Sequence, residues 1–337
     1  MGEIRPKECE PRELTKDQLA GVSYAGLAAA TTTLVQALEH SADEDGGGPF
    51  NCSTAPAWRL PHLRVRDSPA FSYRGLMVDA ARKQIRLGSL KQFVVLCRWY
   101  KLNYLHLHLT DNEAFTFPST AFPQLAAKSS FAYTLAELRE LQAFAAERGV
   151  TCVGEMDVPG HSDAAVAALP ALLGFGSAPH LGVVNFANDT IIGRLQQIFD
   201  EIDDVLPSPF VAIGGDEVDF AALSKLPEIV DALETFQLPS ASDLYRRFIV
   251  KMREFAVARG KTLRVWEGFG PQGGQGGHKP VTPSPVAVPT AGLSVSSFDG
   301  CYYNPPQMAR DGYRIINSNT ATIYINEPTA TAQLAYQ

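Results

Sequence analysis

The sequence lacks several patterns that would assign a protein class at once. Its 29 Lys and Arg residues are outnumbered by 36 Asp and Glu residues, and a formal net charge of −7 offers no basic surface to nucleic acid. The five cysteines share no CxxC spacing, which argues against a zinc knuckle or a thioredoxin-like site. No GxGxxG follows the first predicted strand, as a Rossmann site would require.

Long apolar runs and a secretory signal are also missing. The first 18 residues mix both charge signs, unlike the basic start of a signal peptide. The stretch 20–38 carries no charge, but it contains three consecutive threonines and has apolar residues at helical spacing. We therefore expect an amphipathic helix rather than a membrane span, in a soluble protein.

The remaining composition is that of a globular protein. The chain has 337 residues, of which 45% are hydrophobic and 19% charged, enough for a large core. Residues 41–62 interrupt it with acids, then glycines, then prolines, without periodicity. We predict an N-terminal helix and linker over residues 1–62 and one large domain over residues 63–337.

The large domain alternates short apolar runs with segments of helical periodicity. The runs predicted as strands are 75–80, 104–109, 151–156, 210–213, 263–266, 293–297 and 322–325. The segments predicted as helices are 90–100, 135–148, 190–205 and 242–259. A Gly- and Pro-rich segment, 269–292, is predicted as a mobile loop at the rim of the domain.

This alternation favours a parallel sheet covered by helices, and both a doubly wound sheet and a (β/α)8 barrel of the TIM type fit it. Carboxylates follow strand after strand, as Asp79, Asp111, Asp157 and the pair Asp216 and Glu217. Because barrels build their sites at the C-terminal ends of their strands, this repetition favours the barrel. Seven strands are found where a closed barrel needs eight, so the eighth is missing or undetected.

The strongest chemical signal is the run Gly214-Gly215-Asp216-Glu217 directly after a strand. Two glycines let the backbone leave the strand sharply, and two carboxyls then lie side by side. One interpretation is a carboxylate pair in which one member is kept protonated as a general acid. The alternative is an N-cap acid that opens the next helix.

Two further segments carry histidines near strand ends. Asp157 and His161 flank a Pro-Gly turn, where a histidine that merely satisfies the loop is the alternative to a functional one. His106 and His108 are spaced by two residues, so both rings face one side of a strand and could bind a catalytic metal. Later strands supply no further histidines, so we predict no metal.

Four motifs together resemble the family-20 glycoside hydrolases, the β-N-acetylhexosaminidases. They are RGLMVD at 74–79, YKLN at 100–103 leading into LHLHLTD, GEMDVPGH at 154–161 and IGGDEV at 213–218. Their order and spacing match the family from about residue 71 to residue 217, and more loosely to residue 326. The resemblance implies that residues 1–62 are the remnant of a small α/β domain that precedes the barrel.

The resemblance implies substrate-assisted retaining catalysis without a metal or organic cofactor, in which the sugar's own acetamido oxygen attacks the anomeric carbon. Glu217 would then be the general acid, and Asp216 would hold the acetamido N–H and stabilise the oxazolinium. Tyr324 would donate its hydroxyl to the acetamido carbonyl, and Trp266 would line the acetamido pocket. Trp266 as a plain barrel-core residue is the alternative.

The other residues carried over bind the sugar or orient the acid. Arg74 and Asn326 would contact ring hydroxyls, although Arg74 could instead pair with Asp79 or Asp111. Asp111 and His161 would orient Glu217 and tune its pKa, and Asp157 would support the same region. The substrate implied is an oligosaccharide or glycoconjugate that ends in an amino sugar.

The expected function is exo-hydrolysis of terminal β-linked N-acetylglucosamine or N-acetylgalactosamine. The chain departs from the family at Ala212, where a His is usual, at 112–115, at Phe298 in place of Trp, and at Asn326 in place of Asp. These departures motivate the alternative of a degenerate, non-catalytic sugar-binding homologue. The family is usually secreted, periplasmic or lysosomal, which leaves the compartment of this chain open, as is its oligomeric state.

Overall fold

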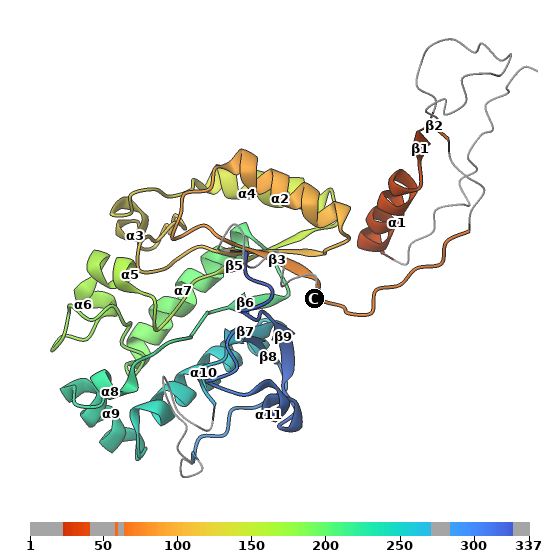
Figure 1. Ribbon diagram of the computed structural model, residues 1–337. Coiled ribbons are helices and arrows are strands. Elements are labelled where there is room, and N and C mark those ends of the chain that lie inside the picture. Colours follow the sequence, from red (N-terminus) through yellow and green to blue (C-terminus); the bar gives the residue numbers. More distant parts are fainter. Residues whose placement is uncertain (1–22, 41–57, 60–63, 271–283, 326–337) are drawn as a thin grey trace, which may run out of the picture.

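The computed structural model describes residues 23–40, 58–59, 64–270 and 284–325 (Figure 1). Seven parallel strands form one sheet whose spatial order is the order of the chain. They are β3 (Gly75–Asp79), β4 (Tyr104–His108), β5 (Thr151–Glu155), β6 (Phe210–Ala212), β7 (Thr262–Trp266), β8 (Leu293–Ser297) and β9 (Arg314–Asn317). A short antiparallel pair, β1 (Glu39–His40) and β2 (Trp58–Arg59), lies outside this sheet.

Helices connect the strands and cover the outside of the sheet, apart from the first helix, which precedes all the strands. They are α1 (Tyr24–Gln36), α2 (Leu87–Trp99), α3 (Gln124–Ala127), α4 (Leu135–Ala146), α5 (Asp163–Ala168), α6 (Pro170–Leu173), α7 (Asp189–Val205), α8 (Phe220–Leu223), α9 (Pro227–Phe236), α10 (Ala241–Ala258) and α11 (Pro305–Arg310). Helix α2 packs against α4, α4 against α7, and α7 against α10. None of the described helices is long and apolar enough to cross a membrane.

The sequential strand order decides between the two predicted architectures. A doubly wound sheet reverses its strand order at a switch point, whereas a TIM barrel adds each strand beside the previous one. Strands β3 to β9 follow the second pattern without a reversal. The fold is therefore a TIM-type barrel of seven described strands, and within the described residues β3 and β9 form its two open edges.

Six of the seven predicted strands are confirmed, and the last one is wrong. The predicted strand at 322–325 follows the true one, β9, and residues 321–323 form a turn. Both segments are short and apolar, so local pattern does not separate them. Pairing with β8 through Ile315 and Ile316 selects the earlier one. Residues 271–283 of the predicted loop at 269–292 lie outside the described residues, and its described parts form no helix or strand.

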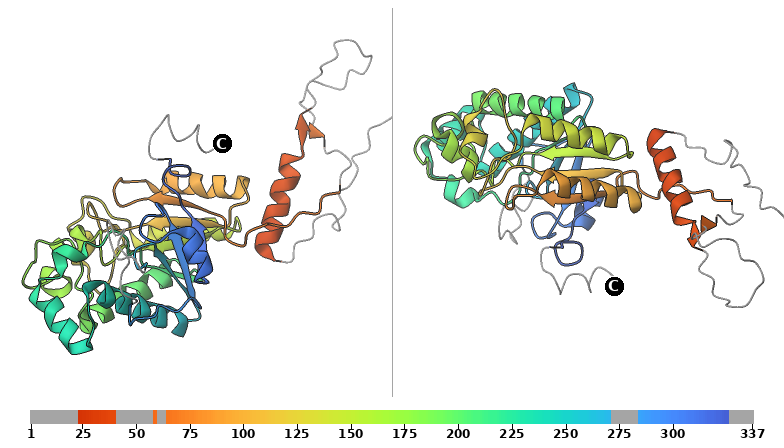
Figure 2. Two further views of the ribbon diagram at one scale, coloured as in Figure 1. Left: turned by 60° about the horizontal axis from the view of Figure 1, so that its bottom comes forward. Right: turned by 90° about the horizontal axis from the view of Figure 1, so that it is seen from above.

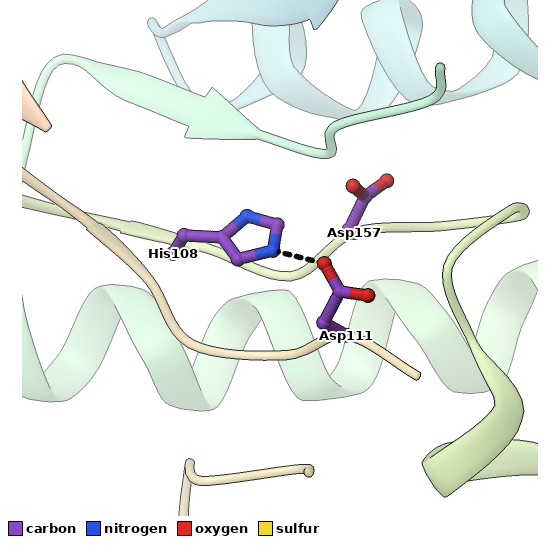
Figure 3. Close-up of side chains that lie close together, drawn as sticks. All are labelled: His108, Asp111 and Asp157. Carbon is purple, nitrogen blue, oxygen red and sulfur yellow. Dashed lines mark hydrogen bonds and ion pairs between the residues drawn. The ribbon is translucent and has the colours of Figure 1, made fainter. Parts of the chain in front are cut away.

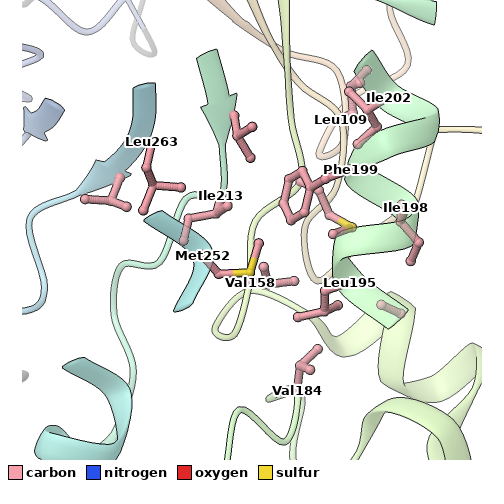
Figure 4. Packing of buried hydrophobic residues seen from close by; sticks show 14 of the residues in the cluster. Leu109, Val158, Val184, Leu195, Ile198, Phe199, Ile202, Ile213, Met252 and Leu263 are labelled. Carbon is pink, nitrogen blue, oxygen red and sulfur yellow. The ribbon is translucent and has the colours of Figure 1, made fainter. Parts of the chain in front are cut away.

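Helix α7 shows how the sequence builds the core between helices and strands. Its N-cap Asn188 accepts hydrogen bonds from the first turn, and its apolar residues recur on one face. Figure 4 shows side chains of this face pointing toward residues of the sheet and of α10, among them Leu109, Ile213, Met252 and Leu263. All of them are buried, so α7 is held against the barrel by apolar packing.

The barrel interior has an aromatic floor and a polar upper layer. Tyr73 and Tyr104 stack with ring centroids 4.7 Å apart, and Phe210 meets Tyr104 edge-on. Tyr104 and Phe210 begin β4 and β6, and Tyr73 precedes β3, so the three rings lie at the N-terminal end of the barrel. Above them the strands direct polar side chains inward, all of them buried: His106, His108, Glu155, Arg264, Ser294 and Ser296. This layer leads to the C-terminal ends, where the site lies.

Candidate active site

Strand β6 ends in two glycines that shape the centre of the site. Gly214 has a φ of 63° and Gly215 of 94°, which side-chain-bearing residues rarely adopt. A Cβ on Gly214 would lie 2.0 Å from Oδ1 of Asp157, and the Gly215 N–H donates to that oxygen at 2.9 Å. The chain thus turns tightly over Asp157 and presents Asp216 and Glu217 at the C-terminal edge of the sheet.

The Glu217 carboxyl is the more accessible of the two acids. Its side chain is 39% exposed, and the residue itself has a φ of 54°, a strained value outside glycine. Its Oε2 lies 3.3 Å from Nε2 of His161, and its Oε1 lies 3.4 Å from the Tyr302 hydroxyl. Each oxygen therefore has a separate partner, while the carboxyl stays open to an incoming group.

Asp216 is held deeper in the same cluster. Its side chain is 17% exposed, and Oδ2 lies 3.5 Å from Nε2 of His161. Its Oδ1 is buried and has no hydrogen-bond partner among the described residues. A buried acceptor without a partner costs free energy, so this oxygen suits a donor that a ligand brings.

His161 forms the cationic centre of the site. Its Nδ1 lies 3.4 Å from Oδ1 of Asp111, and its Nε2 faces Asp216 and Glu217. Burial disfavours the imidazolium, but the carboxylates of Asp111 and Asp216 raise the pKa of His161 to about 11. At neutral pH His161 is therefore protonated, and its imidazolium faces carboxylate oxygens through both nitrogens.

Asp111 and Asp157 lie beneath His161 with opposite behaviour. Burial would raise the pKa of Asp111, but hydrogen bonds from His108 and His161 hold it below its usual range. Burial, and then the nearby charge of Asp216, raise the pKa of Asp157 well above that of a free aspartate. One buried carboxyl is thus a fixed anion and its neighbour favours the neutral acid.

A buried relay connects Asp111 to the barrel interior. The Nε2 of His108 contacts Oδ2 of Asp111 at 2.7 Å (Figure 3). Its Nδ1 contacts Oε1 of Glu155, also at 2.7 Å. The other Glu155 oxygen lies 3.0 Å from Nε2 of His106. Burial alone would lower the pKa of His108, but hydrogen bonds to Asp111 and Glu155 raise it. A protonated His108 therefore lies between the two carboxylates.

Two groups of donor atoms come close enough to hold a metal ion. Donor atoms of His108, Asp111 and Asp157 lie within 4.8 Å of one another, as do those of Asp157, His161 and Asp216. Both nitrogens of His108 already contact carboxylates, however, and His161 is protonated at neutral pH. A nitrogen without a free lone pair is a poor ligand, so both groups fit an ion-pair network better than a metal centre.

An aromatic wall adjoins the two acids. Trp266, Phe298 and Tyr302 form a buried cluster, and Tyr324 packs against it. Phe298 meets Trp266 edge-on at 5.9 Å and stacks on Tyr302 at 5.4 Å. The Trp266 indole N–H donates to Glu155 at 3.3 Å, which fixes the indole plane. The wall is apolar, with hydroxyls at its rim.

One predicted residue, Arg74, does not reach the site. It precedes β3, and its guanidinium donates to the carbonyls of Lys101 and Phe71 at the N-terminal end of the barrel. The assignment of Arg74 is therefore corrected. Arg82, which follows β3 at the other end, lies 2.6 Å from Oδ2 of Asp111 and 2.8 Å from Oδ2 of Asp79.

The model of the glycosyl hydrolase family 20 catalytic domain matches residues 71–336. The chain belongs to glycoside hydrolase family 20. A β-hexosaminidase of Akkermansia muciniphila is 32% identical over 230 residues, 61% of this chain and 46% of that protein. A β-hexosaminidase of Vibrio furnissii is 28% identical over 279 residues, 74% of this chain and 44% of that protein.

Solved family-20 structures share the fold. The exo-β-N-acetylglucosaminidase of Vibrio harveyi, solved with N-acetylglucosamine, superposes with a TM-score of 0.69 at 26% identity, over 88% of this chain and 47% of that one. A β-N-acetylhexosaminidase of Bacteroides fragilis gives a TM-score of 0.71 at 21% identity, over 91% of this chain and 61% of that one. The chain spans about half the length of the curated relatives it matches.

Within this family-20 domain, most of the predicted site residues lie together. Those at the C-terminal end of the barrel are Asp111, Asp157, His161, Asp216, Glu217, Trp266 and Tyr324. Asn326 lies outside the described residues. Sequence reasoning missed Arg82, Glu155 and Tyr302. Arg82 follows Asp79 at a strand end and could have been found by that rule, whereas no local signal marks Tyr302.

Proposed function

We propose that this family-20 domain hydrolyses terminal β-linked N-acetylglucosamine or N-acetylgalactosamine from oligosaccharides or glycoconjugates. The observation that carries the proposal is the pair Asp216 and Glu217 at the C-terminal end of β6, with Glu217 exposed and Asp216 retaining an unpartnered oxygen. Named β-hexosaminidases among the relatives support the same chemistry.

In the first step the acetamido oxygen of the substrate attacks the anomeric carbon. The bond from that carbon to the leaving oxygen breaks, its electron pair stays on the oxygen, and Glu217 delivers a proton there. Exposure of the Glu217 carboxyl allows the leaving group to approach it. In the second step Glu217 removes a proton from the water that opens the oxazolinium ring.

The other residues hold the acetamido group and the acid. Asp216 accepts the acetamido N–H with its unpartnered Oδ1 and stabilises the positive charge that develops on the ring. Tyr324 donates its hydroxyl to the acetamido oxygen, and Trp266 packs on the methyl group within the aromatic wall. His161, anchored by Asp111, orients both acids.

Contacts to the sugar hydroxyls belong to Arg82 rather than to Arg74 in this proposal. The Arg82 side chain is about half exposed and forms ion pairs with Asp79 and Asp111. Because a guanidinium has five N–H groups, several of them remain available to a sugar. Asp157 supports the turn that carries both acids, because it accepts the Gly215 N–H.

The test is release of 4-nitrophenol from its β-N-acetylglucosaminide, with Glu217→Gln as the decisive variant. We expect wild-type turnover and a fall in kcat of at least about 100-fold in the variant, because Glu217 also acts as the general base in the second step, which does not depend on the leaving group. Binding of N-acetylglucosamine, measured by calorimetry, should persist in Glu217→Gln. Glu254→Gln, at an exposed position on α10, is the matched control and should leave kcat unchanged.

A folded wild-type chain that binds N-acetylglucosamine without turnover would contradict the proposal. That result would favour the degenerate, non-catalytic sugar-binding homologue.

A further inference from the structure

The aromatic wall contains a hydroxyl that the proposed mechanism leaves without a task. Tyr302 lies beyond the end of β8, 85 positions away from Glu217 in sequence, and its hydroxyl is 3.4 Å from Oε1 of Glu217. This distance is long for a hydrogen bond between oxygens, but catalytic contacts commonly shorten when a substrate closes the site. The opposite carboxyl oxygen faces His161, so the acid has a donor on each side.

Stacking fixes the ring of Tyr302. Its ring lies on Phe298 with an interplanar angle of 30°, and Phe298 meets Trp266 at 87°. The residue is only 9% exposed. Burial, and then the charge of Glu217, raise the pKa of Tyr302 to about 12, so its hydroxyl stays protonated and donates to the carboxyl at neutral pH.

A second acid holds the turn that carries Tyr302. Glu267 follows β7, is fully buried, and forms no ion pair in the part of the chain that the structure describes. Its carboxyl instead accepts hydrogen bonds from the Ser297 hydroxyl, from the Asp299 N–H at 3.2 Å and from the Gly300 N–H. Three bonds from consecutive parts of one turn fix its path from β8 to Tyr302.

We propose that Tyr302 positions the carboxyl of Glu217 for proton transfer, and that Glu267 maintains this position by holding the turn 297–300. The inference rests on the proposed function. When Glu217 loses its proton to the leaving oxygen, the O–H bond of the acid breaks and a carboxylate remains. The Tyr302 O–H, which keeps its own proton throughout, orients that group and stabilises its new charge.

The way kcat/KM depends on the leaving group distinguishes positioning of the Glu217 carboxyl by Tyr302 from a general structural role of Tyr302. A good leaving group such as 4-nitrophenol needs little help from an acid, whereas a poor one such as 4-methoxyphenol needs full protonation. Loss of a donor to the acid should therefore matter most for the poor leaving group. A change that merely loosens the sugar pocket should lower kcat/KM for both substrates alike.

The experiment compares kcat/KM for the 4-nitrophenyl and 4-methoxyphenyl β-N-acetylglucosaminides in the wild-type chain and in Tyr302→Phe. We expect a loss of about tenfold with 4-methoxyphenyl and of about twofold or less with 4-nitrophenyl, in line with one hydrogen bond to a charged group. Phenylalanine keeps the stacked ring, so the fold should be retained.

Tyr303→Phe is the matched control, because it removes a hydroxyl from the adjacent residue. The Tyr303 hydroxyl donates to Asp311, and its ring packs on Phe269 and Tyr313, away from Glu217. This variant should leave the ratio of the two kcat/KM values at the wild-type level. Glu267→Gln replaces one acceptor oxygen under the turn and should reproduce the Tyr302→Phe pattern at a smaller size.

The outcomes separate the two proposals. Equal losses for both substrates in Tyr302→Phe, or a changed ratio in Tyr303→Phe, would overturn the positioning role while leaving the hydrolase function intact. An unchanged ratio in Glu267→Gln would overturn the role of the turn. A folded wild-type chain that hydrolyses neither glycoside would overturn the proposed function, and this inference with it.

Discussion

His161 is a single residue on which three carboxylates converge. Its imidazole faces Asp111 on one side and Asp216 and Glu217 on the other, and the ring is largely buried. With its pKa raised to about 11, against roughly 6.5 in an unfolded chain, the folded state binds this proton more tightly. His161 should therefore link the stability of the whole domain to pH.

The sign of this linkage predicts how His161→Gln behaves. The stabilisation is fully present below pH about 6.5, where the unfolded chain also carries the proton, and is lost as pH rises toward 11. We expect His161→Gln to lower the free energy of unfolding by roughly 1.5–3 kcal/mol at pH 6 and by progressively less at pH 8 and 10. Denaturant titrations of both proteins at each pH measure the difference.

His180→Gln supplies the control, because His180 is exposed and forms no ion pair within the described residues. Its effect on unfolding should be small and the same at each pH. A pH-independent difference for His161→Gln would show that its proton is not bound more tightly in the folded state.

The two arginines around β3 show what residue-level reading of the sequence achieves. Arg74 and Arg82 flank the same strand, and a parallel barrel places only the residue after the strand at the site. The position of Arg82 after the strand was sufficient to predict it at the site. The prediction instead followed the motif around Arg74, which lies at the N-terminal end of the barrel. Tyr302 is a different case, because its approach to Glu217 depends on how β6 and β8 are arranged in space.

At the scale of elements, the turn after β6 has little conformational freedom. Gly214 and Gly215 adopt positive φ values, and a side chain on Gly214 would overlap Asp157. We expect Gly214→Ala to lower the free energy of unfolding by about 1–3 kcal/mol through backbone strain, and to reduce hydrolysis because Asp157 must move. Thermal unfolding and the 4-nitrophenyl assay measure both effects.

Gly193 provides a control of opposite sign. It is exposed in the middle of α7, and a Cβ there would meet no atom within 4 Å. Gly193→Ala should raise the free energy of unfolding by about 0.5–1 kcal/mol, because alanine restricts the unfolded chain and favours helix. If both substitutions lowered stability equally, the special role of the β6 turn would be contradicted.

Element boundaries were predictable wherever local signals were strong. Thr134 and Glu137 have the spacing of a capping box just before the predicted helix 135–148, and both hydrogen bonds of the box form at the start of α4. Strands β3 to β8 end within one residue of their predicted ends. Strand β9 was misplaced because two apolar runs compete there, and only pairing with β8 chooses between them.

At the scale of the whole molecule, α1 lies at one end, beside α2 and the end of α4 (Figure 2). The contacts are mostly polar: the Tyr24 hydroxyl donates to the Glu147 carbonyl at 2.7 Å, and the Gln36 amide donates to the Trp99 carbonyl at 2.8 Å. Only Thr32 of this helix is fully buried. No residue of α1 belongs to the buried core of the barrel within the described residues.

This arrangement predicts that a chain beginning at residue 64 folds and keeps its activity. Because the described residues of α1 contribute a few hydrogen bonds and little buried apolar surface, we expect the free energy of unfolding to fall by only about 1–3 kcal/mol, with unchanged kcat/KM. In the full-length chain, Tyr24→Phe combined with Gln36→Ala removes two of the same contacts and should give a smaller loss. Aggregation of the shortened chain, or a loss of turnover in it, would mean that residues 1–63 belong to the catalytic unit.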